Sequence, residues 1–142
     1  MGHVFLEKYG KLDIALSLLD KAIKIYQEGD HYFAALHLAG AAEEVLGKFL
    51  KKKGIDTSLE SEKEAFVLVN RELLKRTISE KYAADFLNKA KNSIKHMDEK
   101  NADDEYVVMD PKEDANNMIQ RALTNCWRLE LELTPLMQEF WK

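Results

Sequence analysis

The chain has 142 residues, of which 46% are hydrophobic and 32% are charged, with two prolines and a formal net charge of −4. This composition excludes a disordered chain, and the negative charge argues against broad electrostatic binding to DNA, which requires a basic surface. A domain of this length buries roughly 70% of the surface that its unfolded chain exposes. We therefore expect one globular domain over residues 1–142.

The sequence carries no pattern of a secreted or membrane-spanning protein. Residues 1–7 lack the basic region and the apolar run of a secretory signal, and no apolar stretch approaches the roughly 20 residues of a membrane span. The single cysteine, Cys126, cannot form an internal disulfide, which fits a reducing compartment. These features predict a cytoplasmic protein without membrane contact.

The first half of the chain predicts two antiparallel helices. Apolar residues recur with helical spacing from about residue 12 up to Gly29, whose conformational freedom suits a helix end. Asp30 is expected to cap a second helix, which continues to about residue 53. This second helix is apolar on almost every side and should be central. Its interior glycines, Gly40 and Gly47, each cost about 1 kcal/mol relative to alanine, so we expect them to form a groove that another backbone can approach.

Two further helices are predicted between residues 59 and 97. The third covers about residues 59–75, and the capping-box spacing of Thr77 and Glu80 starts the fourth. The apolar faces of these helices, expected to lie in the core, contain Ala65, Phe66, Val69, Leu73, Leu74, Ala83, Phe86, Leu87, Ala90, Ile94 and Met97.

A fifth helix follows an acidic, irregular segment over residues 98–110. Asp110, Pro111 and Glu113 supply its cap, its first-turn proline and an acid at the third position. The apolar pattern continues to residue 133, and Pro135 should bend or restart the helix. With no segment of alternating hydrophobicity, the expected fold is all-α, a single up-down bundle of four to five helices.

The strongest functional signal is the run Lys91-Asn92-Ser93-Ile94-Lys95-His96 near the end of the fourth helix. Asn92 and His96 lie one turn apart on the face opposite the core, with Lys95 beside them and Lys91 on the flank. A histidine can exchange a proton near neutral pH, and basic neighbours can hold a phosphate. The run therefore indicates phosphodiester chemistry or nucleotide binding, and the alternative is an ordinary solvated surface.

His37 and Glu44 form a second candidate binding pair, two turns apart on one flank of the second helix, while Glu43 points elsewhere. Three interpretations remain open at this stage. The two residues form a buried hydrogen-bonded pair, face water at an edge, or belong to a binding site.

Metal and cofactor chemistry are not predicted. Diiron bundles use paired Glu-x-x-His units, and here only Glu28 and His31 have that spacing, across a helix break. The acidic segment lacks the ligand pattern of an EF-hand. Cys126 lies in the apolar stripe of the last helix and is expected in the core rather than as a nucleophile.

In its helical architecture and in the run from Lys91 to His96, the chain resembles the HEPN superfamily, small helical-bundle domains of ribonuclease toxins and nucleotide-binding partner proteins. The resemblance implies that His96 assists proton transfer at an RNA 2′-hydroxyl or leaving oxygen and that Asn92 orients the phosphate. Lys91 stands at the family's arginine position, although lysine offers one compact charge in place of a planar two-pronged donor. Such ribonucleases use a metal-independent composite site across a homodimer.

Two functions are consistent with the sequence. The first is a homodimeric HEPN-like protein that cleaves or binds RNA or nucleotide in a toxin–antitoxin or defence system, with an antitoxin-type protein as partner. The dimer would use the fourth helix and the small-residue face of the second. The alternative is a noncatalytic helical interaction module, or an inactive relative that binds partners.

Overall fold

A computed structural model describes residues 5–141, so residues 1–4 of the N-terminal segment and Lys142 lie outside the described residues. Within this range the chain forms seven α-helices, one short 310 helix and no β-strand. The all-α prediction is confirmed. The helices are more numerous and shorter than the four or five expected, because two of the predicted helices are interrupted.

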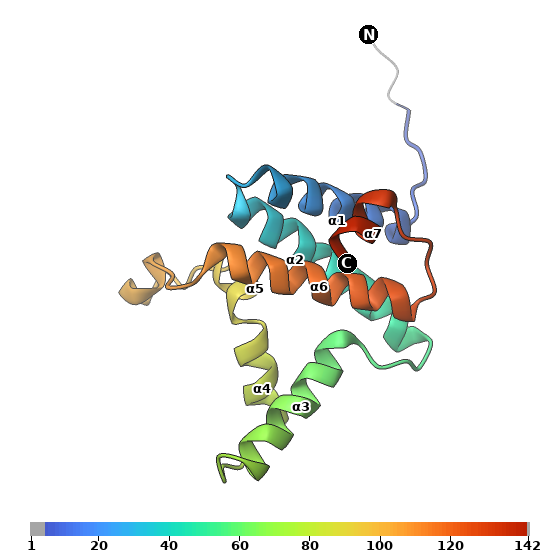
Figure 1. Ribbon diagram of the computed structural model, residues 1–142. Coiled ribbons are helices and arrows are strands. Elements are labelled where there is room, and N and C mark those ends of the chain that lie inside the picture. Colours follow the sequence, from blue (N-terminus) through green and yellow to red (C-terminus); the bar gives the residue numbers. More distant parts are fainter. Residues whose placement is uncertain (1–4, 142) are drawn as a thin grey trace.

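Three long helices form the body of the molecule (Figure 1). Helix α1 (Lys11–Glu28) packs on α2 (Tyr32–Lys52), and α2 packs on α6 (Pro111–Arg128). The last helix, α7 (Pro135–Trp141), lies against α1. Because α2 contacts helices on two sides, the prediction that it is the central helix is confirmed.

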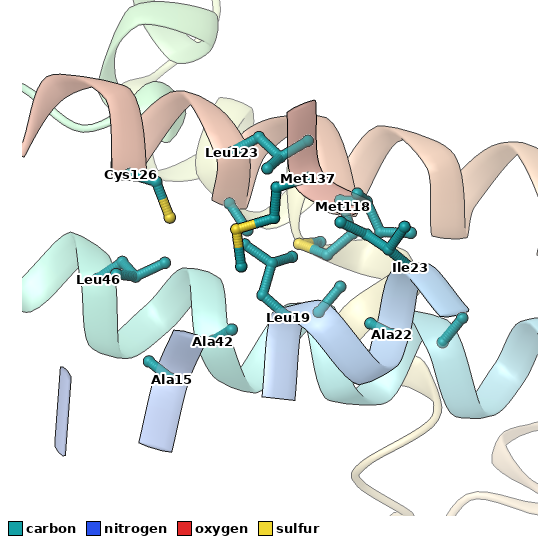
Figure 2. Packing of buried hydrophobic residues seen from close by; sticks show 14 of the residues in the cluster. Ala15, Leu19, Ala22, Ile23, Ala42, Leu46, Met118, Leu123, Cys126 and Met137 are labelled. Carbon is teal, nitrogen blue, oxygen red and sulfur yellow. The ribbon is translucent and has the colours of Figure 1, made fainter. Parts of the chain in front are cut away.

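The hydrophobic core lies where these helices face one another. Leu19 of α1, Leu123 of α6 and Met137 of α7 gather there and are fully buried (Figure 2). Burying one such side chain stabilises the fold by about 1.5–3 kcal/mol. Small residues line the interfaces between the long helices and allow close approach: Ala15, Ala22, Ala35, Ala39, Ala42, Ala115 and Ala122.

Local sequence signals set some of the helix ends. Gly29 ends α1 in the left-handed region with φ of +84°, and its N–H donates to the carbonyls of Ile25 and Tyr26, as predicted. The Asp110 carboxylate accepts from the Glu113 N–H at 3.1 Å and caps α6, also as predicted. The expected cap at Asp30 is wrong.

Helix α2 instead begins after His31, whose side chain makes no capping hydrogen bond. Helix α6 ends at Arg128, earlier than the apolar pattern indicates, and the chain restarts at Pro135 rather than bending. The Thr134 hydroxyl accepts from the Met137 N–H at 3.2 Å and donates to the Asp20 carboxylate, which joins the start of α7 to α1.

Helices α3 (Ser58–Glu72) and α4 (Glu80–Leu87) leave the bundle and meet at their far ends (Figure 1). We call residues 58–87 the arm. Helix α4 is capped by Ser79, whose hydroxyl accepts from the Tyr82 N–H at 3.0 Å, and so the predicted cap at Thr77 is wrong. Several residues expected in the core are exposed because none of the described helices covers this side of the arm: Ala65, Val69, Leu73, Leu74 and Phe86.

The predicted fourth helix does not run to residue 97. It breaks at Asn88, resumes as α5 (Lys89–Ser93) and ends there, so that His96 and the exposed Met97 follow the helix. The acidic segment that follows contains the short 310 helix η1 (Ala102–Glu105), and the chain then enters α6. This break places Lys91 and His96 in different surroundings.

Candidate functional site

A buried ionic cluster joins α2, α5 and α6. The Glu43 carboxylate accepts from Arg121 Nη2 at 2.8 Å through Oε1 and from Lys91 Nζ at 3.3 Å through Oε2. The side chains of Glu43, Lys91 and Arg121 are all about 95% buried, with exposed fractions of 5%, 6% and 4%. Buried charges are tolerated when they are paired and hydrogen-bonded, and here the Glu43 carboxylate is shared between two cations and offsets one of their two positive charges.

Arg121 also holds the helix break at Asn88. Its Nη1 donates to the Leu87 carbonyl at 3.0 Å, and its Nη2 donates to the Asn88 side-chain oxygen at 2.8 Å. The guanidinium thus satisfies a carbonyl at the end of α4. Its Nε has no hydrogen-bond acceptor in the described part of the chain and lies 3.6 Å from Oε2 of Glu62 on α3. Arg121 therefore connects α6 to α2 and to both ends of the arm.

Asn125 extends the buried polar cluster toward the start of α3. Its amide Nδ2 donates to the Glu43 carbonyl at 3.3 Å, and its Oδ1 accepts from the Ser58 N–H at 2.9 Å. The Asn125 side chain is fully buried. One amide thus fixes the first turn of α3 relative to α2.

Gly40 explains how a lysine lies against the central helix. A β-carbon at Gly40 would lie 2.8 Å from Cγ and 2.9 Å from Cδ of Lys91, closer than real β-carbons approach other atoms. The expected groove at Gly40 is therefore filled by the aliphatic stem of a lysine rather than by another backbone. Gly47 has more room, since a β-carbon there would meet Thr57 Cγ2 at 3.5 Å.

The packing of Lys91 against Gly40 separates it from the other residues of the predicted catalytic run, Asn92 and His96. Lys91, predicted on the flank of the polar face, is buried in the ionic cluster, where it does not share a surface with His96. Asn92 and His96 are exposed, and the His96 N–H donates to the Asn92 carbonyl at 3.1 Å, so the two residues remain one turn apart. Lys95 Nζ lies 3.5 Å from Glu44 Oε2.

His37 and Glu44 do not form a buried pair. Both side chains are exposed on α2, and the Glu44 carboxylate interacts with Lys95. The interpretation as a buried hydrogen-bonded pair is therefore wrong. The structure brings Glu44 beside the run that contains His96, whereas it brings no candidate site residue to His37 within hydrogen-bond distance among residues 5–141.

A polar hollow of about 200 Å³ opens beside this run, between α2, the start of α3 and α5. We call it the lysine hollow, because Lys48, Lys51 and Lys91 line it together with Glu43 and Glu44. Glu44 links the hollow to Lys95, the neighbour of His96 in the chain. Lysines are common ligands of phosphate groups, so this edge of the molecule presents an exposed histidine, an exposed amide and a wall that contains three lysines and two glutamates.

A second hollow of about 410 Å³ lies on the other side of Arg121, between the arm and α6. Burial raises the pKa of Glu62, which lines it, and the Arg121 guanidinium offsets this only in part. Burial and the neighbouring Asp110 raise the pKa of Asp114 on the same wall.

Glu43 and Arg121 are the residues of this site that the sequence reasoning missed. Glu43 lies on the buried stripe of α2 that includes Leu36, Ala39, Leu46 and Leu50. Arg121 occupies the corresponding buried stripe of α6. The sequence places an acidic residue in the apolar stripe of one helix and a basic residue in that of another. Because a buried charge requires a partner, this pattern could have predicted the ion pair.

Cys126 is buried as predicted, and burial raises its thiol pKa to about 12.

Among residues 5–141, no three His, Cys, Asp or Glu side chains are grouped so as to hold a metal ion. None of the described helices has both the length and the apolar character needed to cross a membrane. Comparisons with protein-family models, with curated proteins and with solved structures find no match to this chain.

Proposed function

We propose that the chain is a homodimeric HEPN-like protein that binds RNA and cleaves it without a metal. The observation that carries the proposal is the pairing of an exposed histidine and an exposed amide one turn apart, His96 and Asn92, in the run whose Lys91 lines the lysine hollow. Three lysines and two glutamates line the hollow, which leaves an excess of positive charge on a chain whose net charge is −4, so an anionic ligand would find its favourable contacts there.

The reaction suited to these groups is attack of a ribose 2′-oxygen on the adjacent phosphorus. The bond to the 5′-oxygen breaks, a cyclic phosphate forms, and the 5′-oxygen leaves as a hydroxyl. One copy of His96 in a dimer would take the proton from the 2′-hydroxyl, and the other would give a proton to the 5′-oxygen. Asn92 would donate from its amide to a phosphate oxygen.

Lys91 would act in this scheme as a positioning residue. Its ammonium group is bound to Glu43 and its stem lies over Gly40, so it holds α5 against α2. Asn92 follows it directly in the same short helix. In this proposal Lys91 fixes the orientation of α5, while Lys95 and the lysines of the hollow supply the charge that attracts RNA.

A noncatalytic role is the second candidate, and the burial of Lys91 favours it. A cation that stands at the family's arginine position but is neutralised by Glu43 is not free to stabilise a transition state. An inactive relative would keep the dimer and the exposed surface and bind a protein partner of the antitoxin type. RNA cleavage separates the two functions.

The test is RNA cleavage by purified His96→Ala, with His37→Ala as the matched control. Both histidines are exposed, but only His96 belongs to the run whose Lys91 lines the lysine hollow. We expect His96→Ala to retain its melting temperature and to lose roughly 100- to 10,000-fold in rate, whereas His37→Ala cleaves normally. Undiminished cleavage by His96→Ala, or a strictly monomeric mass in light scattering, would contradict the composite site.

A further inference from the structure

The arm contains a hollow of its own, away from the ionic cluster. It measures about 480 Å³ and lies between α3, α4 and the connecting residues 73–79. Its aromatic wall consists of Phe66, Tyr82 and Phe86, and its polar wall includes Arg76 and Ser79. Phe86 also lines the second hollow beside Arg121, whereas the other four residues belong to neither hollow described above.

The aromatic wall presents flat apolar surfaces to solvent. The rings of Phe66 and Phe86 are stacked, with centroids 4.9 Å apart and planes at 10°. Phe86 nevertheless remains 54% exposed, and Tyr82, one turn earlier on α4, is 56% exposed. Exposed aromatic rings beside a basic group are the usual platform on which the bases of single-stranded nucleic acids stack.

Arg76 supplies the basic group, and it is held in place. Its Nη2 donates to the Asn70 side-chain oxygen at 2.8 Å, and its backbone N–H donates to the Asn70 carbonyl at 2.8 Å. Asn70 is itself buried and bonded to the Phe66 carbonyl. No carboxylate lies within ion-pair distance of Arg76 in the described range, so its guanidinium keeps its charge and most of its donors for a ligand.

The tip of the arm is also basic in sequence. Residues 73–79 contain Lys75 and Arg76 and no acidic residue, on a chain with a net charge of −4. A planar apolar platform, a fixed guanidinium and local positive charge together match a ligand that is flat, aromatic and anionic. A nucleotide has these three properties.

We propose that the arm hollow binds one nucleotide unit of single-stranded RNA, with the base against Tyr82 and Phe86 and the phosphate at Arg76. The inference rests on the proposed function, because it gives RNA a second contact remote from His96. A second copy of the chain is the competing occupant of this apolar surface. The unpaired guanidinium in the hollow favours the nucleotide, because an apolar partner would leave that charge uncompensated.

The experiment measures the affinity of adenosine monophosphate by calorimetry and of a labelled single-stranded oligoribonucleotide by fluorescence anisotropy. Tyr82→Ala removes the stacking surface, and Tyr82→Phe keeps it. Arg76→Gln removes the charge in the hollow, while Lys81→Gln removes one from the same arm outside it, where Lys81 is paired with Asp85. We expect both ligands to bind roughly 5- to 100-fold more weakly to Tyr82→Ala and Arg76→Gln and to bind normally to the two controls.

Adenosine without its phosphate tests the role of Arg76, since its affinity should change with Tyr82→Ala but not with Arg76→Gln. Unchanged affinities in both arm variants would overturn the proposal. Loss of adenosine monophosphate binding in His96→Ala alone would also overturn it and would assign the nucleotide to the lysine hollow.

The two proposals can fail separately. If the protein cleaves no RNA but Tyr82→Ala still abolishes nucleotide binding, the arm hollow stands and the ribonuclease proposal falls. If Tyr82→Ala instead converts a dimer to a monomer in light scattering without changing nucleotide affinity, the surface belongs to a second copy of the chain and the arm proposal is wrong.

Discussion

The stem of Lys91 crosses α2 over Gly40, and its ammonium group lies 3.3 Å from the Glu43 carboxylate. Gly40 and Glu43 are three residues apart and therefore lie on the same face of the helix. The glycine makes the space that the lysine stem needs, and the glutamate binds the charge at its end. Steric fit and charge pairing are thus coupled at a single side chain.

Gly40→Ala tests this coupling. The added β-carbon would lie 2.8 Å from Lys91 Cγ, so the lysine must move and its bond to Glu43 must lengthen or break. We expect a loss of about 1–3 kcal/mol in unfolding free energy from overpacking, measured by urea denaturation. Gly47→Ala is the matched control, because its β-carbon meets nothing closer than 3.5 Å and alanine favours a helix by up to about 1 kcal/mol. Equal effects of the two substitutions would show that Lys91 imposes no restriction at Gly40.

Neighbouring glutamates on α2 should differ greatly in importance. Glu43→Gln leaves Lys91 buried without a counter-charge and leaves Arg121 with only the more distant Glu62, and breaking a buried pair in this way costs about 3–5 kcal/mol. Glu44→Gln removes only a partly exposed pair with Lys95 and should cost less than about 1 kcal/mol. Denaturant unfolding of both variants provides the measurement. A cost for Glu43→Gln as small as that for Glu44→Gln would mean that water reaches the cluster.

Stability should depend on pH through Glu62. Because burial raises its pKa in the folded state, the folded protein binds this proton more tightly than the unfolded chain does. Its contribution to stability is therefore present at low pH and is lost as pH rises from the ordinary carboxyl pKa through the raised value. Glu62→Gln cannot ionise, so its stability relative to the wild type should improve as pH rises from the ordinary carboxyl pKa of about 4 towards neutrality.

Urea unfolding of both proteins across this pH range checks the expectation. Glu64→Gln serves as the control, since it removes an exposed carboxylate from the same helix. Parallel pH profiles of the wild type and Glu62→Gln would contradict a role for burial at this position.

Cys126 should be inert in the native protein. Only the thiolate reacts with alkylating agents, and a pKa of about 12 leaves almost no thiolate at neutral pH in a side chain that is also fully buried. We expect slow labelling by iodoacetamide in buffer and rapid labelling in denaturant, followed by mass spectrometry. Fast native labelling would show that α6 opens readily.

Local chemistry in the sequence predicted those helix ends that depend on nearby residues. Gly29 and Asp110 each act within one turn of the chain, and both predictions are confirmed. The break at Asn88 could not be found in this way. It is held by Arg121, which lies 33 residues later in the chain and bonds to the Asn88 side chain.

The amphipathic pattern also does not reveal whether a face has a partner. Leu73 and Leu74 have helical spacing with the rest of the predicted third helix, yet α3 ends before them and they remain exposed, with no cover from another helix within residues 5–141. Among the proposed site residues, the exposure and spacing of Asn92 and His96 followed from periodicity. The burial of Lys91 depends on Gly40 and Glu43, which are distant in sequence, and so required the fold.

The attachment of the arm through Arg121 implies that the molecule can open in parts. In α3 and α4 the buried residues of the described chain are only Ser58, Asn70 and Ala83, whereas the body holds nearly all of the apolar core. Segments with little buried apolar surface open at lower free energy than the global transition. The backbone amides of the arm should therefore exchange hydrogen while those of α2 and α6 remain protected. A ligand that binds the arm should slow the hydrogen exchange of the arm amides.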